Sequence, residues 1–280
     1  LNKLKGLIDA DYDENLIKPM DLWWHTPLQF HIGRRKNVRA YLDMLLVAES
    51  RVGKSSTARA QQKAYGLGTV IPLNGANASR QGIIGGSHKT KDGFQIRAGA
   101  LPRAHRGAVI FEELAKADEG LIKDLTEIRS SNEATITRVS GTFRIPAFVR
   151  MLSLTNTKSK GHEHKPISAY PNGIEIVRDL VGAPEDIARY DLITVLPSKG
   201  AIEIDPYFEP EKPFPLEDYR NRIRWIWSRT PDQIDISPET YRYAVTTANE
   251  LNKVYDSYVK LFGTEAWLKL LRLATAIAGY

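Results

Sequence analysis

The sequence of 280 residues contains no cysteine. A disulfide-stabilised fold, a zinc site with cysteine ligands and a thiol nucleophile are therefore excluded. Long apolar runs are also missing, because Met44–Ala48 and Leu192–Leu196 fall far short of the roughly 20 residues that a membrane-spanning helix needs. The first residues lack the apolar segment of a secretory signal, so we expect a cytoplasmic protein with no membrane partner.

Charge is neither scarce nor strongly one-sided in this chain. The sequence has 39 lysines and arginines against 33 aspartates and glutamates, which gives a formal net charge of +6. With 42% hydrophobic and 26% charged residues, the composition is typical of a globular chain with a substantial core. The mild basic excess is compatible with a polyanionic partner such as nucleic acid but does not require one.

Short apolar runs typical of strands alternate with helical stretches over residues 41–204. The candidate strands are Leu45–Ala48, Thr69–Pro72, Ala108–Phe111, Arg150–Leu154 and Leu192–Leu196. This alternation predicts an α/β body with a mostly parallel sheet, preceded by a lead-in segment over residues 1–40. Four prolines within residues 205–216 predict a linker, because proline interrupts both helices and central strands.

Residues 217–280 have a helical pattern. Ser237-Pro238 is typical of a helix start, with serine as N-cap and proline in the first turn. A last helix is expected to begin after a Thr264 cap and to bury apolar residues as far as Ile277. We therefore predict a small helical domain after the α/β body.

The segment Ala48–Ser55 contains Gly-Lys-Ser directly after an apolar strand and before a helix-compatible stretch. Strand, loop, Gly-Lys-Ser and helix in this order are typical of a P-loop, whose backbone N–H groups form a concave anion site. Lys54 would reach the β- and γ-phosphates of ATP, and the Ser55 hydroxyl would ligate Mg²⁺. Alanine at position 48, where glycine is usual, fits only with a negative φ. The residues expected to line the nucleotide site are Ala48, Glu49, Ser50, Arg51, Val52, Gly53, Lys54, Ser55 and Ser56.

Polar residues follow two further apolar strands. Glu112 and Glu113 end the strand that starts near Gly107. Asn156 ends a later apolar run, which starts at Leu152. In a P-loop ATPase the first acid supports Mg²⁺ and the second activates the attacking water. Because neighbouring strand residues point to opposite faces, both acids reach the phosphates only if the chain bends at the strand end. Asn156 would orient the water between Glu113 and the γ-phosphate.

Each of these motifs also has a plainer interpretation. A Gly-Lys-Ser/Thr triplet occurs by chance in about one of seven chains of this length. Two acids at a helix start are often only solvated there, and an asparagine after a strand commonly forms a turn. Their succession along one chain favours a common phosphate site.

In order and spacing the motifs resemble those of AAA+ ATPases, and more narrowly those of the MCM (minichromosome maintenance) helicase family, in a diverged bacterial form carried on mobile elements such as the staphylococcal cassettes. The resemblance covers residues 40–280. The matching segments are Gly93–Leu101, Glu112–Lys116, Asp186–Ile193 and Leu271–Ala276.

The resemblance implies an AAA+ body with a small helical lid, and ATP with Mg²⁺ bound between the subunits of a homo-oligomeric ring, most often a hexamer. Arg189 would act in trans, as the finger that reaches the ATP of the neighbouring subunit. Two positions depart from the family pattern besides Ala48. Glu112 stands where aspartate is usual, and Glu265 stands where the lid arginine that senses the γ-phosphate would fall.

Two hairpins are expected outside the sheet. One turns at Lys91-Asp92-Gly93 and the other at Ser140-Gly141. Their positions match insertions that line the central channel of MCM-like rings, so the resemblance implies contact with single-stranded or forked DNA. Basic residues on hairpins can also be merely solvated. The residues expected to contact DNA are Lys89, Lys91, Arg138 and Arg144.

We therefore predict a ring-forming ATPase that moves on single-stranded DNA as a replicative-type helicase. Two alternatives stay open at this point. One is an AAA+ ATPase that remodels proteins, of the chelatase or transcription-activator type, and the other is a non-catalytic nucleotide-binding assembly subunit. ATP hydrolysis stimulated by DNA distinguishes the helicase from both.

Overall fold

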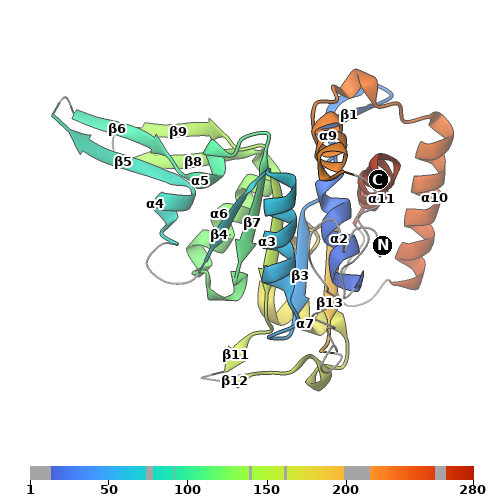
Figure 1. Ribbon diagram of the computed structural model, residues 1–280, viewed down its shortest axis with the longest axis horizontal. Helices are drawn as coiled ribbons and strands as arrows, with labels where there is room; N and C mark the ends of the chain where they lie inside the picture. The colour runs from blue at the N-terminus through green and yellow to red at the C-terminus, as the bar shows by residue number, and fades with distance from the viewer. Residues whose placement is uncertain are drawn as a thin grey trace.

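The computed structural model describes residues 14–73, 78–91, 93–138, 141–160, 163–198, 215–255 and 263–280. Its centre is a five-stranded parallel sheet with the strand order β13-β3-β10-β7-β4 (Figure 1). The strands are β3 (Met44–Ala48), β4 (Thr69–Pro72), β7 (Ala108–Glu112), β10 (Arg150–Thr155) and β13 (Leu192–Leu196). This confirms the expected α/β class.

Helices cover both faces of the sheet. Successive strand residues point to opposite faces, so Leu46 packs in one core cluster and its neighbour Leu45 in the other. The helices that pack in the first cluster include α2 (Glu14–Trp24), α3 (Lys54–Tyr65) and α9 (Leu216–Trp227). Those in the second are α6 (Glu119–Ser131), α7 (Gly173–Val181) and the short α8 (Pro184–Ile187). Burial on both sides explains why the central strands β3, β7 and β10 are nearly continuous apolar runs.

Two β-hairpins project together from one side of the body, away from the C-terminal helices (Figure 1). They pair β5 (Gly85–Thr90) with β6 (Gly93–Ala98), and β8 (Glu133–Arg138) with β9 (Gly141–Pro146). Both confirm the sequence prediction, although the turn residues Asp92 and Ser140 lie outside the described residues. Strand β5 lies against β8, so the hairpins form one projection. The short helices α4 (Arg80–Ile83) and α5 (Ala100–Arg103) flank the first hairpin.

The C-terminal part consists of α9, α10 (Pro238–Val254) and α11 (Ala266–Gly279). Helix α10 begins as predicted, with Ser237 Oγ accepting a hydrogen bond from the Thr240 N–H at 3.1 Å. The prediction for α11 was wrong in two respects. The helix begins one residue later, with Glu265 rather than Thr264 at the N-cap, and Ile277 is 57% exposed. The buried face of α11 is set by its packing on α10 and α2, which a periodic pattern alone does not specify.

Arg272 ties α11 to the sheet. Its Nη1 donates to Asp191 Oδ1 at 2.5 Å and its Nε to the backbone oxygen of Arg39 at 3.0 Å. Asp191 Oδ2 accepts from Arg39 Nη2 and from the Asp43 N–H, both at 2.9 Å. Burial alone would raise the pKa of Asp191, but the charges of Arg39 and Arg272 lower it below its ordinary value. The junction between α11 and the sheet is thus a charged, buried network.

The remaining elements are short. They are β1 (Gln29–Ile32), β2 (Arg35–Arg39), η2 (Leu114–Lys116), β11 (Ser159–Lys160), β12 (Glu163–His164), η3 (Ile167–Ala169) and η4 (Pro231–Gln233). Most of the expected linker lies outside the described residues, so the domain boundaries stay a prediction. Within the described ranges, no helix is long and apolar enough to span a bilayer.

Candidate functional site

The candidate nucleotide site lies where three neighbouring strands of the sheet end. Strands β3, β10 and β7 are adjacent and parallel, so their last residues meet at one edge. Ala48 ends β3, Glu112 ends β7, and Thr155 ends β10 immediately before Asn156. Ligands of open α/β sheets bind at this carboxyl edge. The fold therefore brings together three segments that are far apart in the sequence.

The loop between β3 and α3 has the backbone of a tight anion-binding turn. Ala48 belongs to β3 and is not among the residues with positive φ, as alanine at this place requires. Arg51 and Gly53 do have positive φ, of 66° and 88°. Helix α3 begins at Lys54, so Ser55 and Ser56 lie in its first turn, where backbone N–H groups have no partner within the helix. The loop and this turn can therefore bind phosphate oxygens.

Lys54 is the central cation of the site. Its side chain donates hydrogen bonds to Asn156 Oδ1 and to the backbone oxygens of Ala48 and Glu49, the latter two at 3.4 Å. Burial lowers the pKa of Lys54, whereas the charges of Glu113 and Glu112 act in the opposite direction. A partly desolvated ammonium group held by carbonyl and amide oxygens can exchange these partners for phosphate oxygens.

The two acids have different environments. Glu112 is the last residue of β7, and Arg59 of α3 donates to both its carboxylate oxygens. Glu113 follows in the left-handed conformation, with φ 61° and ψ 44°, and its Oε2 lies 2.8 Å from Lys116 Nζ. This is the bend that the sequence required, because a continuing strand would direct the two carboxylates to opposite faces.

Asn156 and Glu49 tie the loop to neighbouring segments. Asn156 Nδ2 lies 3.5 Å from Ser50 Oγ, while its Oδ1 accepts from Lys54. The carboxylate of Glu49 accepts the Ile167 N–H at 3.0 Å and the Ser198 N–H at 3.1 Å. The loop is thus held in place from the ends of both β10 and β13.

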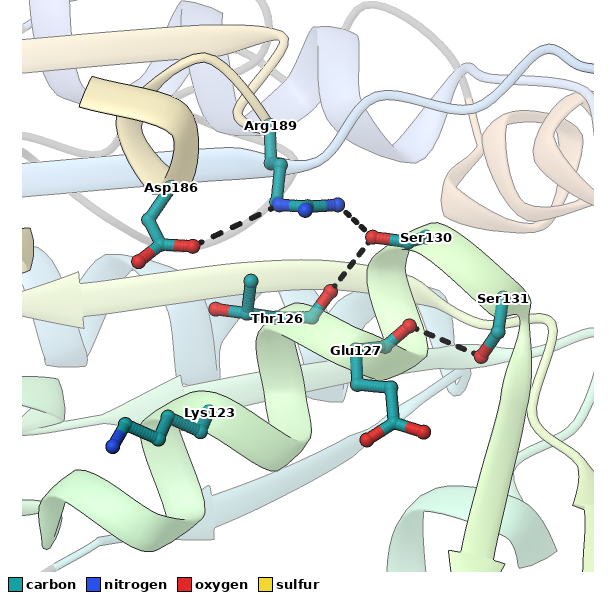
Figure 2. Close-up of a pocket in the computed structure, with 7 residues that line it drawn as sticks. All are labelled: Lys123, Thr126, Glu127, Ser130, Ser131, Asp186 and Arg189. Carbon is teal, nitrogen blue, oxygen red and sulfur yellow. Dashed lines mark hydrogen bonds and ion pairs between the residues drawn. The ribbon is translucent and has the colours of Figure 1, made fainter. Parts of the chain in front are cut away.

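Arg189 lies apart from this cluster, on a pocket formed by α6 and the turn after α8 (Figure 2). Its Nη1 donates to Ser130 Oγ, and its Nε lies 3.7 Å from Asp186 Oδ1. Figure 2 shows the guanidinium extended between these two partners. The partners of Arg189 in its own chain thus lie on α6 and α8.

An adjoining pocket that Arg189 also lines is rich in cations. Arg129, Lys269 and Arg272 line it together with Glu265, whose Oε1 lies 3.5 Å from Arg35 Nη1. Arg129 is almost fully buried. Burial lowers the pKa of Arg272, as does the neighbouring charge of Arg39, so positive charges crowd each other in this pocket. Sequence reasoning missed Arg129 and Lys269, because no local motif marks them.

The four basic residues expected to contact DNA lie on the projecting hairpins, well away from Lys54. Lys89 is on β5, Lys91 is in the turn that follows, Arg138 ends β8 and Arg144 is on β9, and all are exposed. Phe94 is directly opposite Lys89 in the β5–β6 ladder and is 73% exposed. This aromatic ring is a further candidate that the charge pattern overlooked.

Arg59 is a further residue that sequence reasoning missed. It lies on α3 four residues after Ser55, which places both on one face of the helix. That four-residue spacing could have identified Arg59 from the sequence, because the helix face that carries Ser55 must lie against the strand ends for the P-loop to bind phosphate. The fold was needed to show that Glu112 is its partner.

Comparison with known families gives one match. The model of the MCM P-loop domain matches residues 26–205, which is more than half of the chain. The matched span contains the candidate nucleotide site, both hairpins and Arg189. No curated protein matches the sequence significantly.

Proposed function

Because the chain belongs to the MCM P-loop domain family, we propose that it is an ATP-driven translocase of the replicative helicase type, which assembles into a ring and moves on single-stranded DNA. The contact network of Lys54 carries this proposal. It joins the P-loop to Asn156 and lies within electrostatic reach of Glu112 and Glu113. A phosphate cradle, a water-orienting amide and two acids at one sheet edge are what ATP hydrolysis needs.

In this proposal each residue of the cradle has a separate role. The backbone of residues 48–56 and the ammonium group of Lys54 bind the triphosphate. Glu113 accepts the proton of the attacking water, and Asn156 orients that water, since its amide already lies beside Lys54. Arg189 of a neighbouring copy stabilises the negative charge that develops on the γ-phosphate.

Mg²⁺ is the expected metal of a P-loop ATPase. The Ser55 hydroxyl and the Glu112 carboxylate are hard oxygen donors and fit it. In this proposal the remaining ligands of the metal would come from phosphates and water. When bound, Mg²⁺ would neutralise charge on the β- and γ-phosphates.

A trans role for Arg189 is supported by its place on the pocket shown in Figure 2, away from the P-loop of its own chain. A finger that serves a neighbour must lie on the surface that meets that neighbour. Head-to-tail contacts of this kind close into rings when the rotation between copies permits. We propose a hexamer, with Arg129 and Lys269 adding positive charge beside the finger.

DNA contact is supported by the joint projection of the two hairpins. Lys89, Lys91, Arg138 and Arg144 lie exposed on them, and Phe94 offers a flat ring for base stacking. The mobile-element origin remains part of the proposal on the sequence resemblance alone, and the cytoplasmic location stays a prediction.

The test is ATP turnover with and without single-stranded DNA at two salt concentrations. We expect stimulation by DNA that weakens at the higher salt, because phosphate contacts release counterions. The double substitution Lys89→Gln/Lys91→Gln should reduce this stimulation and leave turnover without DNA unchanged.

The matched control is Lys18→Gln, which removes an exposed charge from α2, far from the hairpins. Turnover that no DNA stimulates would favour the protein-remodelling alternative. A purified chain that does not bind ATP would contradict the proposal as a whole.

A further inference from the structure

Glu112 and Arg59 form the best-defined ion pair of the candidate site. Arg59 Nε donates to Glu112 Oε1 at 2.9 Å, and Nη2 donates to Oε2 at 2.5 Å. The Glu112 side chain is only 4% exposed, whereas that of Arg59 is 61% exposed. Such a two-pronged pairing is among the strongest side-chain interactions, and a buried carboxylate needs a counter-charge. Arg59 therefore binds both carboxylate oxygens of Glu112, the residue proposed to support Mg²⁺.

The backbone leaves Glu112 little freedom to reach a ligand by itself. It is paired in the sheet with Leu154 on one side and Pro72 on the other, and its carbonyl accepts the Leu73 N–H at 2.9 Å. Any change at this carboxylate must therefore come from side chains. Arg59 lies one helical turn after Ser55, on the same face of α3. The arginine thus competes for the space in which the serine hydroxyl and the carboxylate would meet a cation.

We propose that Arg59 is a positioning residue that sets how much Mg²⁺ the chain needs to bind a nucleotide. It holds Glu112 in place and neutralises it in the nucleotide-free protein. Arg59 occupies one acceptor site on each oxygen of Glu112, so Mg²⁺ or a water of its shell gains full access to this carboxylate when Arg59 releases at least one hydrogen bond. The exposed guanidinium can make that exchange, because water solvates it on release. This inference rests on the proposed nucleotide function and adds to it a residue outside the P-loop and the strand-end motifs.

The test is a titration of a fluorescent ADP analogue against the full 280-residue chain, at Mg²⁺ concentrations that start from none, with a chelator present. For Arg59→Gln we expect the Mg²⁺ concentration at half-maximal affinity to fall roughly threefold to tenfold, the effect of one partly screened charge-assisted hydrogen bond. Lys63→Gln is the matched control, since it removes a charge from an exposed position one turn further along α3.

Two further variants make the test specific. Arg59→Lys keeps the charge but not the two-pronged geometry, so we expect a smaller shift in the same direction. In a Glu112→Gln background, Arg59→Gln should give no further shift, because the competition needs the carboxylate. An unchanged or raised Mg²⁺ midpoint for Arg59→Gln, with nucleotide still bound, would overturn this inference alone. A parent chain that binds no nucleotide at any Mg²⁺ concentration would overturn it together with the proposed function.

Discussion

Glu113 has a left-handed backbone conformation, which its proposed role in ATP hydrolysis requires. A non-glycine residue in the left-handed region costs about 1–3 kcal/mol and persists only where its surroundings fix it. Here β7 ends at Glu112, the residues after Glu113 form the turn η2, and Ala115 N–H donates to Thr155 Oγ1 at 3.1 Å. The left-handed conformation of Glu113 therefore turns the chain out of the strand, while Glu112 remains paired in the sheet.

We expect Glu113→Gln to bind ATP as well as the parent and to hydrolyse it about 10²- to 10⁴-fold more slowly, because the amide cannot accept the proton of the attacking water. Steady-state phosphate release and equilibrium nucleotide binding measure the two properties separately. Glu119→Gln, at the exposed start of α6, is the control. Unchanged hydrolysis in Glu113→Gln would favour the non-catalytic assembly subunit instead.

At the scale of elements, the first hairpin is anchored by a glycine. Gly99 N–H donates to the Ile84 oxygen at 3.1 Å where β6 returns to the body. A Cβ on Gly99 would lie 2.3 Å from the Ile83 carbonyl oxygen, closer than any real contact. The projecting strands therefore leave the body through a gap that only glycine permits.

Gly99→Ala should lower the free energy of unfolding by about 1–3 kcal/mol, the usual cost of forcing a methyl group into a packed site. Urea unfolding measures it. Gly173→Ala is a suitable control, because its Cβ would meet Val195 at an ordinary 3.5 Å and α7 already begins there. Equal stability of the two variants would mean that the hairpin base adjusts without cost.

The elements that could be predicted from the sequence are those with local causes. Short apolar runs between helical stretches predicted the parallel strands, so β4 and β13 were located to the residue although these edge strands are only partly buried. Ser237-Pro238 located the start of α10. Helix α2 was missed because Pro19 lies inside it. It is stabilised by contacts with α3 and α11, which lie far away in the sequence.

In the candidate site, too, only the features with a local cause could be predicted from the sequence. Lys54, Glu113 and Asn156 were identified because each follows its own strand, and parallel strands bring their ends together. The pair between Arg59 and Glu112 spans 53 positions and depends on how α3 crosses the sheet. No local pattern encodes that crossing.

At the scale of the whole molecule, the chain separates its two half-sites. Lys54 lies at the sheet edge, whereas Arg189 lies on the pocket between α6 and the turn after α8. In the proposed function a single copy therefore has a phosphate cradle without a finger, and a finger without a phosphate. Identical copies arranged head to tail would complete both at every interface.

Mixing two inactive variants tests this arrangement. Arg189→Ala keeps an intact cradle, and Glu113→Gln keeps an intact finger, so each alone should hydrolyse ATP slowly. In an equimolar mixture that forms rings at random, about one quarter of the interfaces would join an intact cradle to an intact finger. We expect ATP turnover of the mixture to rise clearly above that of either variant alone. Mixing Arg189→Ala with a Lys54→Ala/Arg189→Ala double variant is the control, because no interface then holds an intact finger. If turnover of the first mixture stays at the average of its components, Arg189 does not act across an interface.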